Sequence, residues 1–374
     1  MFRWSKYHYP SIYIYNHFRG CIIDNNQNDV KDIICDFDSL YKAMLKCRKG
    51  VMWKDSVSRY VNNGLVSTLK LLNSLKNEKY EIDDYYKFTI HEPKEREIVS
   101  NRFKDRVFQR SMVDNYLYGV ITKGFIYDNC ACQVGKGTDF ARNRLKCHMQ
   151  RFFRKHGLDG YVLKCDIKNY FGSTNHNKSL SFLKKYVNNS WVFEHLQAIF
   201  DSYSDKDNPG VGIGLGSQVN QLTQLLFLSE LDHCIKERLR IKQYIRYMDD
   251  FILIHPGKEY LRGCRYEIKN YLDSLELRLN NKKTQIFPLK QGINYLGFKF
   301  KLTNTGKVLM LLNKENIKKR KRKLRKYKKL VNKERMTREK ADQCYESWKA
   351  HAKKGNSNRL LQGMDRYYAN LWEG

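Results

Sequence analysis

Hydrophobic residues recur at helical spacing along most of the chain. Side chains three and four residues apart lie on one face of a helix, so this periodicity predicts helices. They are expected at residues 39–48, 57–75, 102–120, 138–156, 175–203, 218–239 and 260–277, and again from residue 313. The helix at 138–156 follows Gly135-Lys136-Gly137, and Thr138 is its expected N-cap.

Short apolar or alternating runs between these helices predict strands. They lie at residues 83–99 with a break at Pro93, and at 161–167, 244–255, 285–287, 293–302 and 308–312. The run at 244–255 has Asp249-Asp250 at its centre, which predicts a β-hairpin with this pair at its tip. The mixture of strands and helices predicts an α+β body with a helical C-terminal region.

The balance of charge points to the kind of partner. Seventy Lys and Arg against 39 Asp and Glu give a formal net charge of +31. A compact chain with this charge repels itself, which favours a polyanionic partner such as nucleic acid. No run of 18 apolar residues predicts a membrane span, and the aromatic, charge-interrupted start is unlike a signal peptide. The ten scattered cysteines include no C-x-x-C pair, which favours free thiols in the cytoplasm over zinc or disulfides.

Three aspartates are the strongest candidates for chemistry. Asp166 follows an apolar run, and Asp249 and Asp250 sit between the apolar halves of the hairpin. Side-by-side carboxylates in apolar surroundings cost free energy unless a cation compensates them. Nucleotide transfer to a primer 3′-hydroxyl uses two divalent ions about 4 Å apart, which carboxylates hold. A solvated Asp-Asp turn would explain the hairpin alone, but a third aspartate at a strand end favours a polymerase palm.

In this order the motifs resemble those of reverse transcriptases, from about residue 40 to the C-terminus. Asp166-Ile167-Lys168-Asn169-Tyr170-Phe171 resembles the first palm motif, and Tyr247-Met248-Asp249-Asp250 resembles the YxDD box. The resemblance implies a right-hand polymerase fold, with fingers, a palm whose antiparallel sheet carries the hairpin, and a helical thumb. It implies an N-terminal helical extension and fingers at 1–90, fingers at 91–160, palm at 161–307 with a helical insertion at about 175–210, and a basic thumb at 308–374.

The resemblance also implies a metal site. Asp166 and Asp249 would hold two Mg²⁺ ions, for which Mn²⁺ can substitute. Asp250 would assist, and the carbonyl of Ile167 would be a further ligand.

Other motifs imply contacts with nucleotide and primer. Residues 93–99 resemble the fingers motif, with Lys94 and Arg96 at the triphosphate. Phe171 is the expected steric gate against ribonucleotides, with an ordinary core phenylalanine as the alternative. Lys283, in a motif at 281–284, would lie near the incoming nucleotide, and Tyr295, Leu296 and Gly297 resemble the primer grip. Residues 212–218 take the place of the glycine loop, and Gln221 would lie near template or nucleotide or simply face the palm from its helix.

Residues 313–331 contain eleven Lys or Arg residues and one Glu. Ile317, Leu324, Tyr327 and Val331 form a narrow apolar stripe at helical spacing. The position just after the primer grip favours a thumb helix along template and primer over a merely solvated helix. The residues expected to contact phosphates are Lys318, Lys319, Arg320, Arg322, Lys323, Arg325 and Lys326.

Within the family, the stretches HEPKEREIVSNRFKDRVFQ, GFIYDNCACQVGKGT and SWKAHAKKGN are similar to enzymes of diversity-generating retroelements and of phage defence. The former carry Ser-Gln where this chain has Asn220-Gln221, which favours a defence role. The implied partners are dNTPs, a primer or cDNA, a dedicated structured noncoding RNA template and an accessory protein. An inactive RNA-binding protein and an RNA-dependent RNA polymerase are the alternatives, and the priming mechanism is open.

Overall fold

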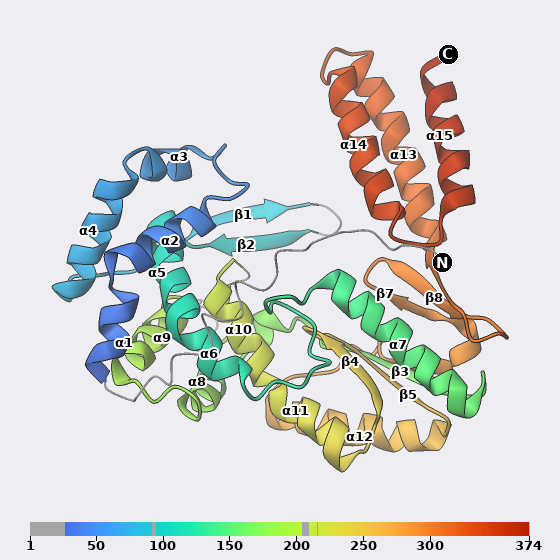
Figure 1. Cartoon of the computed structure of the whole chain (residues 1–374), viewed down its shortest axis with the longest axis horizontal. Helices are drawn as coiled ribbons and strands as arrows, with labels where there is room; N and C mark the ends of the chain where they lie inside the picture. The colour runs from blue at the N-terminus through green and yellow to red at the C-terminus, as the bar shows by residue number, and fades with distance from the viewer. Residues whose placement is uncertain (1–26, 92–94, 204–208, 215, 374) are drawn as a thin grey trace, which may run out of the picture. The chain divides into compact units, whose positions relative to one another are not determined.

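The structure is a computed structural model that describes residues 27–91, 95–203, 209–214 and 216–373. Its described residues form two compact units that alternate along the chain (Figure 1). Unit 1 comprises residues up to 126 together with 168–230 and 273–277, and unit 2 comprises 127–167, 231–272 and 278–374.

Unit 1 is mainly helical. Its helices are α1 (Gln27–Ile34), α2 (Phe37–Cys47), α3 (Asp55–Asn62), α4 (Gly64–Lys76), α5 (Phe103–Met112), α6 (Tyr118–Thr122), α8 (His176–Lys184), α9 (Ser190–Ser202) and α10 (Gln218–Phe227). A π-helical turn at Val113–Leu117 joins α5 to α6. The strands β1 (Tyr86–Ile90) and β2 (Arg96–Ser100) form an antiparallel hairpin. Leu40, Ala43 and Met44 are buried on one face of α2, which packs against α5.

Unit 2 is built on a four-stranded antiparallel sheet with strand order β4-β5-β3-β6. The strands are β3 (Tyr161–Asp166), β4 (Gln243–Tyr247), β5 (Asp250–His255) and β6 (Gln285–Pro288). Helix α7 (Thr138–His156) packs on β4 and β5. Its buried face carries Ala141, Leu145, Met149 and Phe152, whose spacing of four, four and three residues explains why this segment is a helix. In chain order, β4 is preceded by the short helix α11 (Ser229–His233) and a π-helical turn (Cys234–Arg238), and β5 is followed by α12 (Lys258–Ser274).

A smaller sheet and three helices follow in unit 2. The sheet is β7-β8-β9, at Ile293–Tyr295, Phe298–Leu302 and Val308–Leu312. Helices α13 (Lys314–Val331), α14 (Arg338–Ala352) and α15 (Asn358–Glu373) then pack as a bundle (Figure 1). Leu324 of the predicted apolar stripe is fully buried in this bundle, and Tyr345 stacks on Tyr368 with ring centroids 4.1 Å apart.

The α+β prediction is confirmed, and most of the expected elements lie within a few residues of their predicted positions. Four predicted elements are each divided, because residues 57–75 break at Gly64, residues 175–203 break after α8, residues 218–239 break at Leu228, and residues 293–302 turn at Leu296-Gly297. Thr138 is the first helical residue of α7, and the N-cap is Gly137, so that prediction was wrong. Residues 127–160, expected in the fingers, group with the sheet of unit 2. No described helix is both long enough and apolar enough to span a bilayer.

Candidate active site

Two of the three predicted aspartates are direct neighbours across the main sheet. Asp166 is the last residue of β3 and pairs in register with Asp250, the first residue of β5. Tyr247 at the end of β4 also pairs with Asp250, so Met248 and Asp249 form the tip of the hairpin. Residues paired in register on antiparallel strands point to the same face of a sheet. The carboxylates of Asp166 and Asp250 therefore lie together.

Lysine side chains accompany both carboxylates. The Nζ of Lys283 lies 2.7 and 2.6 Å from the two oxygens of Asp166. The Nδ2 of Asn280 donates to Asp166 Oδ1 at 3.1 Å. Lys164 on β3 places its Nζ 3.1 Å from Asp250 Oδ2 and donates to the carbonyl of Asn294 at 2.8 Å. Lys283, predicted near the nucleotide, thus lies at the carboxylates.

The surroundings of Asp250 fit a divalent cation. Burial raises the pKa of Asp250 to about 6, Lys164 opposes the rise, and the charges of Asp249 and Asp166 add to it. Asp250 Oδ1 is buried and has no hydrogen-bond partner among the described residues. No three His, Cys, Asp or Glu side chains in the described ranges are gathered closely enough to hold a metal ion as they stand. The lysine ammonium groups supply the compensating charge, while hard oxygen ligands and an unpartnered buried oxygen suit a divalent ion.

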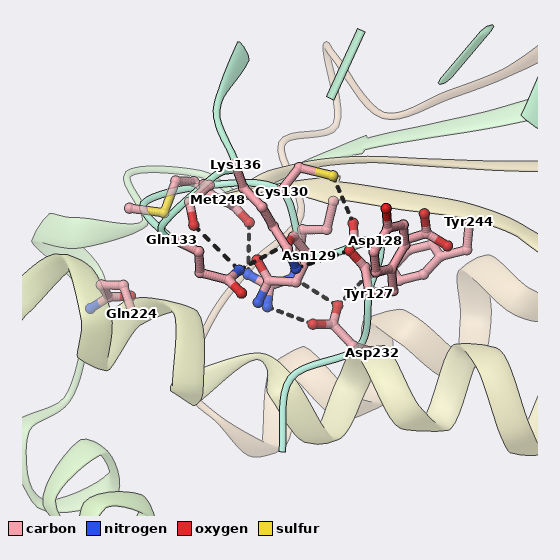
Figure 2. Close-up of polar contacts among 12 residues, drawn as sticks. Tyr127, Asp128, Asn129, Cys130, Gln133, Lys136, Gln224, Asp232, Tyr244 and Met248 are labelled. Atoms are coloured by element: carbon pink, nitrogen blue, oxygen red, sulfur yellow. Dashed lines mark hydrogen bonds and ion pairs between the residues drawn. The ribbon is translucent and has the colours of Figure 1, made fainter. Parts of the chain in front are cut away.

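A fully buried ion pair between Asp232 and Arg246 holds the hairpin in place. Met248 at its tip has a φ of +56°, a conformation that a side chain other than glycine adopts only when its surroundings hold it there. Arg246 donates from Nη1 to the Met248 carbonyl at 3.2 Å, and from Nε and Nη2 to Asp232 at 2.7 and 2.6 Å. The Tyr244 hydroxyl also donates to Asp232, at 2.6 Å. Figure 2 labels Asp232, Tyr244 and Met248 and draws the polar contacts among these residues as dashed lines.

Backbone hydrogen bonds join the segment before α7 to the same strand, β4. The backbone N–H of Arg246 donates to the carbonyl of Asp128 at 3.0 Å, and the N–H of Cys130 donates to the carbonyl of Arg246 at 2.9 Å (Figure 2). Burial alone would raise the pKa of the Asp128 carboxyl, but His148 and Lys236 beside it hold that pKa below its ordinary range. Part of the GFIYDNCACQVGKGT stretch therefore has a structural role, because it holds β4 in place.

Of the residues predicted as a primer grip, Tyr295 ends β7, and Leu296 and Gly297 form the turn to β8. Leu296 and Gly297 have φ angles of +45° and +87°. Arg142 of α7 is buried and donates to the Leu296 carbonyl from Nη2 at 3.0 Å and from Nε at 3.3 Å. A Cβ on Gly297 would lie 3.6 Å from the ring of His351 on α14. The turn is thus fixed from α7 on one side and adjoins the helical bundle on the other.

Phe171 and Gln221, two of the predicted nucleotide-binding residues, belong to unit 1. Phe171 is half-buried and opens a 3₁₀ turn, Phe171–Ser173. The carbonyl of Phe171 accepts from the N–H of Ile213 at 2.9 Å, and this contact holds the glycine-rich segment against the turn. Gln221 lies half-buried on α10, while its neighbour Asn220 is fully buried and donates to the Gly214 carbonyl at 3.0 Å. Asn220 therefore positions the glycine-rich segment.

The fingers motif is described only in part. Arg96 is the first residue of β2 and pairs with Ile90, whereas Lys94 lies outside the described residues. On α13, five of the seven predicted phosphate-binding residues are exposed (Lys318, Lys319, Arg322, Arg325 and Lys326). Arg320 and Lys323 are half-buried and lie over the rings of Trp348 and Tyr327, at 5.7 and 6.0 Å from the ring centroids.

The sequence profile of the family described as "Reverse transcriptase (RNA-dependent DNA polymerase)" matches residues 91–300, more than half of the chain. The chain belongs to this reverse transcriptase family. The match includes all three aspartates, and with the mixed helix-and-sheet architecture it confirms the predicted right-hand polymerase fold class. Helices α13–α15 of this reverse transcriptase lie beyond the matched range.

The relatives of this reverse transcriptase resemble it over a short stretch or at low sequence identity. Protein P of two strains of duck hepatitis B virus is 33% identical over 73 residues, which is 20% of this chain and 8% or 9% of theirs. Among solved structures, telomerase from Candida albicans in complex with the TWJ fragment of telomeric RNA has a TM-score of 0.46 at 12% identity, over 64% of this chain and 48% of that one. Apo telomerase from Candida tropicalis has a TM-score of 0.45 at 14% identity, over 62% and 49%. This chain thus spans about half of the solved chains and under a tenth of the curated relatives.

Sequence reasoning missed the residues that support the carboxylates. These are Lys164, Asp232, Arg246 and Asn280, which contact the aspartates or the hairpin as given above. One signal was present in the sequence, since the charged Arg246 follows Tyr244-Ile245 and stands directly before the YxDD box. A charge at a position whose neighbours are buried requires a partner, although the sequence does not say which one.

Proposed function

We propose that this protein is an RNA-directed DNA polymerase that copies an RNA template into cDNA from dNTPs. The pairing of Asp166 with Asp250 beside the hairpin tip carries this proposal. Two carboxylates that share one face of a sheet, with lysines supplying positive charge, suit phosphoryl transfer better than they suit a structural site. Family membership supports the same assignment.

The residues present fit two divalent ions, which we propose to be Mg²⁺, with Mn²⁺ able to substitute. Asp166, Asp249 and Asp250 would hold them together with the carbonyl of Ile167, whose side chain is buried and whose backbone bridges to Leu279. When bound, such ions lower the pKa of the primer 3′-hydroxyl and neutralise the triphosphate. Lys283 lies at Asp166 and is the cation best placed for an incoming phosphate.

Substrate choice is assigned to the other predicted nucleotide-binding residues. Phe171 is the proposed gate against the ribose 2′-hydroxyl, Arg96 and Lys94 are proposed to bind the triphosphate, and Gln221 is proposed to lie near template or nucleotide. Phe171→Ala should raise incorporation of ribonucleotides relative to deoxyribonucleotides, and Phe171→Tyr should keep the discrimination because the ring remains. An unchanged ratio in Phe171→Ala would remove the gate assignment.

We propose that the remaining regions take the fingers, palm and thumb roles predicted from the sequence. Tyr295, Leu296 and Gly297 are the proposed primer grip. The exposed basic residues of α13 are the proposed contacts to the template–primer backbone. Such contacts set affinity and register, and they make affinity fall as salt rises, by about 0.9 in log K per phosphate neutralised.

Primer extension on poly(rA)/oligo(dT) tests the central proposal. The parent should incorporate dNTPs only with a divalent ion, and Asp250→Asn should reduce the rate by at least about 100-fold. Asp159→Asn is the matched control, because Asp159 lies in unit 2 with an 87% exposed side chain. Asp249→Ala/Asp250→Ala extending at the parental rate would refute the proposal. RNA binding without incorporation would favour an inactive RNA-binding protein, and a preference for rNTPs would favour an RNA-dependent RNA polymerase.

For the biological role we favour phage defence with a dedicated structured noncoding RNA, and sequence diversification is the alternative. Asn220-Gln221 in place of Ser-Gln supports defence. Sequencing both the RNA bound to the purified protein and the cDNA it makes would test this choice. A variable-repeat product made with an accessory subunit would overturn the defence role.

A further inference from the structure

Helix α13 presents its basic residues on two separate faces. One face carries Arg322, Arg325, Lys326 and Lys329 around a shallow hollow of about 330 Å³, and we call it the ridge. The other face adjoins α14 and carries Lys319, Arg320 and Lys323. At 100° per residue, the mean directions of the two faces differ by roughly 115° around the helix axis. A ligand bound on the second face would therefore also contact α14.

Two adjoining hollows of about 240 and 350 Å³ follow the seam between α13 and α14 and share Arg320 and Lys323. We call them together the α13–α14 groove. The helices that form it pack against each other within unit 2 (Figure 1). The basic residues that line the groove are Lys319, Arg320, Lys323 and Lys340, and no carboxylate of the described chain lines it. This charge fits an anionic ligand.

Arg320 is oriented before any ligand binds. Its guanidinium carbon lies 5.7 Å from the centroid of the Trp348 ring, and its Nη1 donates to the Cys344 carbonyl at 3.4 Å. Trp348 in turn stacks on Tyr345 with centroids 5.9 Å apart. An arginine held on an aromatic ring loses less side-chain freedom on binding, and a planar guanidinium suits the recognition of phosphate.

Uncharged polar groups line the same groove. Gln343 and Ser347 lie on one face of α14 together with Lys340, and all three are exposed. Asn316 contributes a further side-chain amide from α13. Hydroxyl and amide groups beside phosphate-binding cations suit the ribose 2′-hydroxyl, which both donates and accepts hydrogen bonds and which DNA lacks.

We propose that the α13–α14 groove binds an RNA strand through its phosphates and 2′-hydroxyls. It is a second nucleic-acid contact of this chain, beside the template–primer contacts proposed for the exposed basic residues of α13, and the two share Lys319. The groove selects RNA over DNA, whereas the ridge contacts phosphates and treats both alike. This inference goes beyond the proposed polymerase activity and does not depend on it.

Fluorescence anisotropy in EDTA, without dNTPs, tests the inference. The probes are labelled oligo(rU) and oligo(dU), each about 16 nucleotides long, which differ only in the 2′-hydroxyl. The full-length parent should bind oligo(rU) about tenfold more tightly, because two additional hydrogen bonds of ordinary strength are made. Lys340→Ala/Gln343→Ala/Ser347→Ala should reduce this ratio to near one.

Arg325→Ala on the ridge is the matched control, because it also removes one exposed positive charge from the bundle. It should weaken binding of both probes by the same factor and keep their ratio. Circular dichroism and thermal melting establish that each variant is folded, and Ser347→Ala alone, a single change at an exposed site, should lower the ratio in part. A parent that binds both probes equally, or a groove variant with an unchanged ratio, would overturn the inference. The primer-extension result would be unaffected in either case.

Discussion

The buried pair below the hairpin gives the sharpest prediction. Asp232 and Arg246 are both 0% exposed, and two hydrogen bonds of 2.7 and 2.6 Å join them. Asp232→Asn leaves the Arg246 charge buried without its counter-ion. Breaking a buried pair in this way costs about 3–5 kcal/mol. We expect urea unfolding to report that loss and Tm to fall by roughly 10 °C.

A second variant separates stability from positioning. Asp232→Leu/Tyr244→Phe/Arg246→Met replaces these three side chains together, so none of them is left buried without the other two. Replacing a buried pair by apolar residues of similar volume is often neutral, so stability should return to within about 1–2 kcal/mol of the parent. Extension should stay at least about tenfold below the parent, because the Met248 carbonyl has lost its donor. The divalent ion concentration needed for half-maximal rate should rise, since Asp249 is no longer held in place.

The reasoning fails if the triple variant recovers extension together with stability. The pair would then act only through folding, and the positive φ of Met248 would need no brace. A Tm of Asp232→Asn equal to that of the parent would contradict the assignment of a buried, paired charge.

Two further predictions concern Asp105 and Gly214 of unit 1, and Gly263 serves as the control for Gly214. Burial raises the pKa of Asp105 from its ordinary 3.8 to about 6, and a hydrogen bond from Tyr80 opposes the rise. The protonated Asp105 therefore contributes fully to the free energy of unfolding at low pH, and this contribution is lost as pH rises from about 4 to 6. Urea unfolding of Asp105→Asn should therefore gain up to about 3 kcal/mol on the parent between pH 4 and 7, and a difference that does not vary with pH would contradict this. Gly214→Ala should destabilise by about 1–3 kcal/mol in the same assay, because the new Cβ would overlap the Tyr203 ring. Gly263→Ala in α12, which meets open space, should instead stabilise by about 0.5–1 kcal/mol, and equal effects at the two glycines would refute the packing argument.

Much of the local structure follows from the chain's own pattern. The apolar spacing of α7 and the alternation around Asp249-Asp250 predict a helix and a hairpin close to those observed. The breaks within predicted helices and strands were missed because each depends on the backbone conformation at one or two residues. Periodicity continues across residues 57–75, but it does not report that the chain turns at Gly64. The apolar positions of 293–302 likewise predict one strand, while the φ angles at Leu296 and Gly297 reverse the chain.

By itself the sequence determined the candidate carboxylates, the excess of positive charge and the apolar stripe of α13, because each depends on residue type and on spacing within one element. Only the tertiary structure decided which groups compensate those carboxylates. Lys283 meets Asp166 across 117 residues, and Arg142 reaches the Leu296 carbonyl across 154. Arg246 finds Asp232 fourteen residues away, but only because a strand and a helix pack side by side. Periodicity reports which face of an element is buried, whereas the partner of a buried charge depends on how separate elements pack.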